Sequence, residues 1–341
     1  MFLTSITEND IMIIRSPDIL FDACKKLITN TPAIFYKGEN LMSVSILNKI
    51  IAVIVLISSL LRIDLGFGLN PTKKTVDLAG YELVWQDEFD GTELDRSKWN
   101  DSQNVDTIHW GAVRNGGDWH EDMISVSDGN LHIRTKYLDE ETASKYGGDY
   151  KAGWYSGYVT TYQSDPQDET NPDSFLYGYY ETRCILPKGQ GLWAAFWMMN
   201  GDVYNVDGSG RDGTEIDIFE DFGYEYEPKM TADCVSVNLH WDGYEDAHQN
   251  DHVGNFYAEN PYTQYNTYGV KWTPDEYIFY INDHECARTD KGGVSQNPES
   301  LILSVEVAGE NGNAFGRGDI TKNSGDVDFI VDYVRVYQAA K

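Results

Sequence analysis

The sequence predicts an all-β domain built as a two-sheet β-sandwich. Short runs rich in β-branched and aromatic residues recur from residue 81 to the end of the chain, and clusters of Gly, Asp, Asn and Pro separate them. No long stretch of helical periodicity interrupts this part of the chain. Many short strands without helices bury their apolar faces best by packing two sheets together.

The first segment, residues 1–68, is expected to be an N-terminal extension with a hydrophobic signal. Residues 50–61 form an unbroken run of aliphatic and small residues between Lys49 and Arg62. Such a run is short for a membrane span and suits the apolar part of a signal peptide. We therefore expect a secreted protein, cleaved after Gly68.

Two features of this segment leave alternatives open. Met42 is a natural start for a leader of ordinary length, with residues 1–41 as an extension of the reading frame. An uncleaved helix over residues 44–65 would instead anchor the protein in a membrane, although Lys49, Arg62 and Asp64 would strain it. Only in that case is the membrane a partner.

After a polar linker at residues 69–79, the expected strands follow in chain order. They are residues 81–85, 123–126, 131–135, 157–161, 178–185, 192–199, 213–221, 235–241, 268–272, 277–281, 301–307 and 329–338. Long polar loops at residues 165–174, 200–213 and 242–260 separate some of them, and loops of such length are often functional.

The charge and the cysteines restrict the partners. A formal net charge of −29 argues against nucleic acid or an anionic membrane surface, and it is unfavourable for a sulfated polysaccharide. Beyond the N-terminal segment the cysteines are Cys184, Cys234 and Cys286, without metal-binding spacing. Cys184 and Cys234 lie in strand-like runs and are expected to be buried apolar residues, while one disulfide remains open.

Three carboxylates mark residues 213–221. Because side chains alternate along a strand, Glu215 and Asp217 share one face. A β-bulge at Ile218 and Phe219 would return Glu220 to that face. Three acids side by side among apolar neighbours repel one another and resist ionisation together, so their pKa values should separate.

Aromatic residues crowd the sequence around these acids. They are Trp193, Trp197, Tyr204, Phe222, Tyr224, Tyr226 and Trp241. Acids that alternate with apolar residues are also typical of an ordinary amphipathic strand. Carboxylates beside aromatic rings, however, suit a sugar, and two carboxyl groups can hydrolyse a glycoside.

The run from Glu215 to Glu220 resembles the signature of glycoside hydrolase family 16 in its bulged form, Glu-x-Asp-x-x-Glu. Residues 83–91, 177–183, 186–193, 195–198 and 332–337 resemble further blocks of the family, in the same order. The resemblance implies a β-jelly roll in residues 80–341, with a concave sheet as the substrate cleft.

The resemblance also implies the catalytic roles. Glu215 is the nucleophile, Glu220 is the general acid/base and Asp217 assists between them. In such a retaining enzyme Glu220 must be protonated at rest and Glu215 must be ionised.

Candidate substrate-binding residues come from the aromatic, histidine and arginine residues near the motif. They are Trp193, Trp197, His240, Trp241, Trp110, Arg114 and Trp119. A core role stays open for Trp193 or Trp197, and a structural role for His240. Residues 109–121 depart from the Trp-Gly-Asn-x-Glu-x-Gln stretch of many β-1,3-glucanases of the family, which leaves the sugar specificity open.

The chemistry needs no cofactor, but the resemblance implies a possible structural Ca²⁺. By analogy Glu88, a carbonyl near Gly129 and Asp332 would supply oxygen ligands. Each of these residues could equally be an ordinary turn or edge residue. The spacing of His240, His248 and His252 matches no strong zinc pattern.

These observations predict a secreted, monomeric, retaining endo-β-glycanase whose partner is a polysaccharide, most simply a β-1,3 or mixed β-1,3/1,4-glucan. The alternatives are an endo-β-galactanase on algal or mucin-type galactans, a non-catalytic carbohydrate-binding jelly roll, and a membrane-anchored transglycosylase. Intact Glu215, Asp217 and Glu220 argue against pure binding, since a lectin does not need all three.

Overall fold

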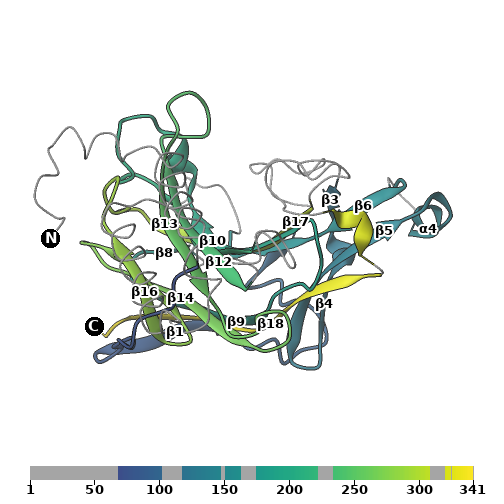
Figure 1. Ribbon diagram of the computed structural model, residues 1–341, viewed down its shortest axis with the longest axis horizontal. Helices are drawn as coiled ribbons and strands as arrows, with labels where there is room; N and C mark the ends of the chain where they lie inside the picture. Colours follow the sequence, from purple (N-terminus) through teal and green to yellow (C-terminus); the bar gives the residue numbers. More distant parts are fainter. Residues whose placement is uncertain are drawn as a thin grey trace, which may run out of the picture. The chain divides into compact units, whose positions relative to one another are not determined.

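Two sheets, antiparallel except for the parallel pair of β3 with β6, pack against each other (Figure 1). The computed structural model describes residues 68–101, 117–146, 150–162, 174–221, 233–307, 319–323 and 325–340. These residues belong to one unit, Gly68–Lys341. The predicted all-β sandwich is confirmed.

The first sheet contains the order β16-β15-β14-β9-β18-β5-β6-β3, with β1 paired to β18 and β4 paired to β5. Its strands are β1 (Tyr81–Asp87), β3 (Gly117–Trp119), β4 (Ile124–Ser127), β5 (Asn130–Leu138), β6 (Gly153–Ser156), β9 (Gly178–Ile185), β14 (Asn266–Trp272), β15 (Tyr277–Ile281), β16 (His284–Thr289) and β18 (Val327–Ala339).

The second sheet contains the order β13-β12-β11-β10-β17-β7-β2, with β8 paired to β17. Its strands are β2 (Asn100–Asp101), β7 (Tyr158–Thr160), β8 (Ser174–Phe175), β10 (Leu192–Met199), β11 (Glu215–Asp221), β12 (Cys234–Trp241), β13 (Gln249–Tyr257) and β17 (Glu299–Val307). The short helices of the described residues are η1 (Glu121–Met123), α4 (Glu140–Tyr146), η2 (Gly201–Tyr204) and η4 (Ile320–Lys322).

Strict alternation divides the second sheet into a core face and a functional face. In β10 the residues Leu192, Ala194, Phe196 and Met198 belong to the main core cluster, whereas Trp193 and Trp197, at the alternate positions, do not. Because β10 and β17 pair residue by residue, the same division continues into the neighbouring strand. The residues opposite the core are therefore the ones free to meet a substrate.

The segment expected to be a linker, residues 69–79, is attached to both sheets by backbone hydrogen bonds. Leu69 N–H donates to the Asn255 carbonyl at 2.7 Å, and Val76 N–H donates to the Asp283 carbonyl at 2.8 Å. An isolated bridge also joins Thr75 to His284. This segment is part of the folded domain rather than a free connection.

The cysteines follow the prediction, because Cys184 and Cys234 are buried. Together with Cys286, they are free thiols in the described part of the chain. Within the same described ranges, no helix has the length and apolar character needed to cross a membrane. Residues 44–65, the predicted signal or anchor, lie outside the described residues.

Candidate active site

The predicted β-bulge in β11 is confirmed. Asp217 pairs with Asn238 and Glu220 with Ser236, so Ile218 and Phe219 together face the single residue Val237 of β12. Ile218 and Phe219 both enter the core. The extra residue thus returns the Glu220 side chain to the face that carries Glu215 and Asp217.

The additional core residue is Phe219, which is fully buried. Its ring lies 4.5 Å from the Tyr268 ring of β14 and 6.2 Å from the Phe329 ring of β18, centroid to centroid. Both partners belong to the other sheet, so the opposite layer of the sandwich packs against the bulge.

Glu220 is buried and held by two donors. Trp193 Nε1 donates to Glu220 Oε1 at 2.9 Å, and Asn238 Nδ2 donates to Glu220 Oε2. Burial, followed by the charges of Asp217 and Glu215, raises the pKa of Glu220 well above its ordinary value, while the Asn238 hydrogen bond opposes the rise. A carboxyl with a raised pKa keeps its proton near neutral pH and can act as an acid.

Glu215 is more accessible than Glu220 and has a different partner. The Tyr244 hydroxyl donates to Glu215 Oε2. Burial and the neighbouring Glu215 carboxylate raise the pKa of Tyr244 well above its ordinary value. Tyr244 therefore keeps its proton at neutral pH and orients the Glu215 carboxylate.

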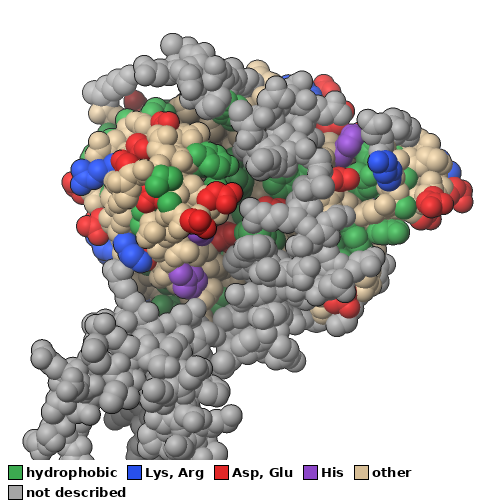
Figure 2. Space-filling view, turned by 90° about the horizontal axis from the view of Figure 1, so that it is seen from above, with side chains coloured by type: hydrophobic (Ala, Val, Ile, Leu, Met, Phe, Trp, Pro, Cys, Tyr) green, Lys and Arg blue, Asp and Glu red, His purple; other side chains and the backbone are tan. Residues whose placement is uncertain are grey.

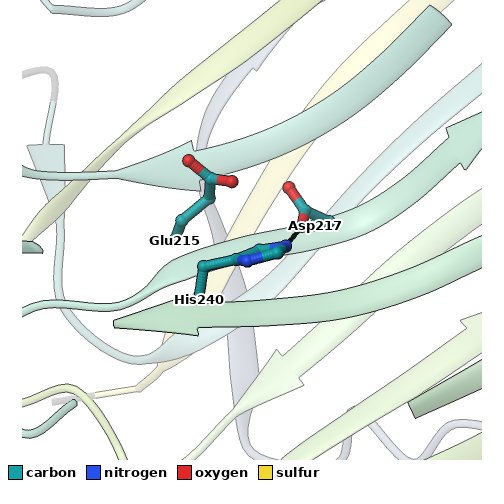
Figure 3. Close-up of side chains that lie close together, drawn as sticks. All are labelled: Glu215, Asp217 and His240. Carbon is teal, nitrogen blue, oxygen red and sulfur yellow. Dashed lines mark ion pairs between the residues drawn. The ribbon is translucent and has the colours of Figure 1, made fainter. Parts of the chain in front are cut away.

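A chain of polar contacts extends from Asp217 through two histidines. His240 lies opposite Glu215 in β12, and its Nε2 is 3.4 Å from Asp217 Oδ2. His240 Nδ1 and His248 Nε2 share a hydrogen bond of 2.8 Å, and the two rings are stacked. Figure 3 shows Glu215, Asp217 and His240 converging from these two neighbouring strands.

These three side chains also form the one group of the described residues with metal-ligating geometry, since one ligand atom from each lies within 4.8 Å of the others. They are the same residues that would surround the reacting sugar. An ion bound there would occupy the place of the substrate.

The expected calcium ligands are held by arginines instead. Both Glu88 carboxylate oxygens accept hydrogen bonds from Arg335, at 2.7 and 2.8 Å. Asp332 forms an ion pair with Arg183. Gly129 lies in a turn at φ +72°. This backbone conformation favours glycine, so the presence of a glycine here does not require a metal ion. The arginine pairs use both oxygens of Glu88 and one oxygen of Asp332, which weighs against a calcium ion there, and the calcium site stays a prediction.

The predicted tryptophans divide into three environments. Trp193 is half-buried and contacts Glu220, as described above. Trp197 Nε1 donates to Ser304 Oγ at 3.1 Å on the functional face. Trp119 Nε1 donates to the Val305 carbonyl at 2.7 Å, and its ring packs on Tyr158. These three remain near the face expected for substrate.

Trp241 is placed differently from our expectation. Only 5% of its surface is exposed, and it belongs to the main core cluster with Val237 and Leu239 of the same strand. The alternation that points His240 toward the acids necessarily turns Trp241 into the core. Trp110 and Arg114 lie outside the described residues.

Two contacts of the acids were not predicted: Asn238 donates to Glu220, and Tyr244, in a run of residues 240–244 expected to reach the cleft, donates to Glu215. Asn238 could have been found, because it lies two residues before His240 and therefore on the same face. Tyr244 comes from a loop, and sequence alternation gives no direction for a loop side chain.

Comparison with known proteins gives a consistent result. The family model described as "Beta-porphyranase A-D, GH16 domain" matches residues 83–339. The chain is 29% identical over 299 residues to "Glucan endo-1,3-beta-glucosidase A1" of Niallia circulans, a match that covers 81% of this chain and 40% of that protein. It is also 29% identical to "Keratan-sulfate endo-1,4-beta-galactosidase" of Sphingobacterium multivorum, over 79% of this chain and 58% of the relative.

A solved structure supports the same assignment. The crystal structure of SCLam, a non-specific endo-beta-1,3(4)-glucanase from family GH16, superposes with a TM-score of 0.60 at 25% identity. The match covers 80% of this chain and 97% of that one. The chain thus spans nearly all of that solved structure, but less than two thirds of the two full-length relatives.

Proposed function

The chain belongs to glycoside hydrolase family 16, and on this premise we propose that it is a retaining, endo-acting glycoside hydrolase that cleaves internal β-linkages of a polysaccharide. The observation that carries the proposal is the contrast between two acids on one face of β11. Glu220 is buried with a raised pKa, whereas Glu215 is accessible and accepts from Tyr244. Two carboxyl groups in unlike environments are what an acid and a nucleophile require.

The reaction proceeds in two steps. Glu215 attacks the anomeric carbon while Glu220 gives its proton to the departing glycosidic oxygen, which leaves a glycosyl ester on Glu215. The ionised Glu220 then takes a proton from a water molecule, and the resulting hydroxide displaces Glu215 from the same carbon. The product regains its configuration, and both carboxyl groups return to their starting states.

Neighbouring residues support each step. Asp217 adds negative charge beside Glu220 and so favours its protonated form before the first step. The hydrogen bond from Tyr244 holds one oxygen of Glu215 and leaves the other for attack. His240 contacts Asp217, and His248 fixes the orientation of the His240 ring.

As substrate we propose a β-1,3 or mixed β-1,3/1,4-glucan. The relative from Niallia circulans and the SCLam structure support a glucan. A galactan is the second candidate, because the matching family model is of the porphyranase type and one relative is a keratan-sulfate galactosidase. The net charge of −29 weighs against a sulfated chain.

Reducing-end release from laminarin, barley β-glucan, lichenan, agarose, carrageenan and a mucin preparation tests the proposal. The wild-type protein is compared with Glu215→Ala and Glu220→Ala. We expect activity on a glucan that both substitutions abolish. Activity restricted to a galactan would replace the substrate but keep the mechanism. Binding without turnover in all three proteins would identify a carbohydrate-binding module.

We further propose that the protein is exported as a monomer and cleaved after Gly68. Among the residues that the structure describes, Leu69 is the first with a backbone hydrogen bond to the domain, so cleavage before it would leave every described strand intact. Sequencing the N-terminus of protein recovered from the medium tests this. A membrane-bound product that retains residues 44–65 would support the anchored alternative. Size-exclusion chromatography tests the oligomeric state.

A further inference from the structure

Two exposed tyrosines lie beside the nucleophile. The Tyr244 hydroxyl orients Glu215, but neither aromatic ring has a part in the reaction steps above. Tyr204 ends η2 and is 50% exposed, and Tyr244 follows β12 and is 39% exposed. Their ring centroids are 5.5 Å apart at an interplanar angle of 69°. We call Tyr204 and Tyr244 the tyrosine platform.

The platform is held in place from both sides. Gly243 N–H donates to the Val203 carbonyl at 2.7 Å, which ties the Tyr244 loop to η2. Asp242 Oδ1 accepts from the backbone N–H groups of Asp207 and Gly208, each at 3.0 Å. Two apolar rings fixed at the surface lose little conformational freedom when a ligand binds them.

The platform is continuous with the active site, because the Tyr244 hydroxyl donates directly to Glu215. A sugar positioned for attack by Glu215 therefore lies next to Tyr244, whose ring contacts that of Tyr204. The C–H groups on the apolar face of a pyranose can pack against the face of an aromatic ring. The stacking partner is thus a sugar of the substrate chain itself.

The charges around the platform decide which sugar it accepts. The acids in residues 200–213 and 242–248 are Asp202, Asp207, Asp212, Asp242, Glu245 and Asp246. Arg211 is the one Lys or Arg in those two described ranges. The space-filling view shows acidic, basic and apolar side chains together on the uncovered surface of the molecule (Figure 2). A sulfate group would meet net negative charge here.

We propose that Tyr204 and Tyr244 form a subsite for an uncharged pyranose ring next to Glu215, so that the enzyme selects unsulfated β-glycans. The inference rests on the proposed function and adds to it the class of substrate. It also distinguishes between the two candidate substrates, since a neutral galactan remains acceptable whereas a sulfated one does not.

Binding by the inactive variant Glu220→Gln tests the subsite apart from turnover. The probes are laminarihexaose, neoagarohexaose and chemically sulfated laminarin, measured by isothermal titration calorimetry. Tyr204→Ala is added to remove the ring, and Tyr204→Phe to keep it. Tyr137→Ala is the matched control, because Tyr137 is also 50% exposed and also has an edge-to-face partner, Trp154, on strands β5 and β6.

Loss of a stacking ring should weaken binding of the neutral hexasaccharide about 3- to 10-fold, since such contacts contribute roughly 0.5–1.5 kcal/mol. Tyr204→Phe and Tyr137→Ala should bind like the Glu220→Gln parent. Sulfated laminarin should bind more weakly than laminarihexaose, and salt should narrow the gap by screening.

Three results would overturn the subsite: equal binding by Tyr204→Ala and Tyr137→Ala, tighter binding of sulfated laminarin than of laminarihexaose, or no binding of either neutral hexasaccharide by the folded Glu220→Gln protein. Failure of the proposed function is a separate result. It would appear as absence of hydrolysis by the wild-type protein on every polysaccharide while the binding pattern persists.

Discussion

Asp217 and Asn238 lie directly opposite each other in the pairing of β11 with β12, and they act on Glu220 in opposite directions. Burial is the largest cause of the raised Glu220 pKa, the Asp217 charge raises it further, and the hydrogen bond from Asn238 lowers it. Two side chains that face each other across a strand pair therefore shift, in opposite directions, the pH at which the general acid loses its proton.

Replacement of Asn238 by Ala should move the basic limb of the kcat/KM profile to higher pH. The amide stabilises the ionised form of Glu220, so its removal raises the pKa of the acid. The measurement is kcat/KM against pH on a soluble glucan. An unchanged or acid-shifted basic limb would contradict the assignment of Glu220 as the acid.

Asp217→Asn should have the opposite effect. Without the neighbouring negative charge the pKa of Glu220 falls, and the basic limb moves to lower pH. Since kcat will also fall, the position of the limb rather than its height is the informative quantity. If the Asn238 and Asp217 variants shift the limb in the same direction, the two side chains do not act through Glu220.

Tyr244→Phe should lower kcat roughly 10- to 100-fold, because a hydrogen bond to a charged group contributes ~1.5–3 kcal/mol. The ring that forms the platform is retained, so KM for a neutral glucan should change little. Steady-state kinetics beside Tyr137→Phe, an exposed tyrosine on β5, provides the control. A raised KM with unchanged kcat would mean that the hydroxyl binds substrate and does not orient Glu215.

Glu299→Gln should stabilise the protein progressively as pH rises from 5 to 8. Glu299 is 0% exposed at the start of β17, and burial raises its pKa from 4.5 to about 8. Across this window the unfolded chain releases the proton while the native protein retains it, so wild-type stability falls with pH. Because Gln cannot ionise, the variant does not lose this stability as the pH rises.

Thermal unfolding of the wild type and Glu299→Gln at several pH values measures this difference. The gap in Tm should widen from pH 5 to pH 8 and then level off. The Thr214 N–H, 3.4 Å from Glu299 Oε1, keeps an acceptor in the Gln variant, so the substitution isolates the charge. A constant gap would show that Glu299 does not titrate in this range.

Removal of calcium with EDTA should leave Tm and activity unchanged. The carboxylates of Glu88 and Asp332 are paired with Arg335 and Arg183, which use the oxygens that a calcium ion would need. Differential scanning fluorimetry with EDTA and with added CaCl₂ measures the effect. A clear rise in Tm on adding calcium alone would locate the ion elsewhere in the chain.

The sequence predicted the parts of the fold and site that depend on alternation. The sandwich and the bulge followed from the parity of apolar and acidic residues, since Ile218 and Phe219 both enter the core while Glu220 returns to the face of Glu215 and Asp217. Alternation along the strand also places Trp241 in the core. We predicted a substrate contact for Trp241 because it lies near the acids in the sequence, and alternation should have taken precedence.

What alternation could not predict are the loops and the edges. The short helix α4 is polar, so its sequence has no apolar periodicity that would predict a helix. Residues 69–79 are polar in sequence and look like a linker, but backbone hydrogen bonds and the apolar side chains of Leu69, Val76 and Leu78 attach them to the sheets. Tyr244 reaches Glu215 only because the loop after β12 is tied back to η2, a contact between segments that are distant in sequence.

The bulge has a further consequence for how the enzyme responds to heat. Phe219, the residue that sets the spacing of the catalytic acids, is packed on Tyr268 and Phe329 of the opposite sheet. If the packing of the Tyr268 and Phe329 rings loosens, Phe219 can shift, and the distance between the two catalytic carboxyl groups changes. The rate of turnover therefore depends on the packing between the two sheets. Catalysis should decline on warming before the sandwich itself unfolds.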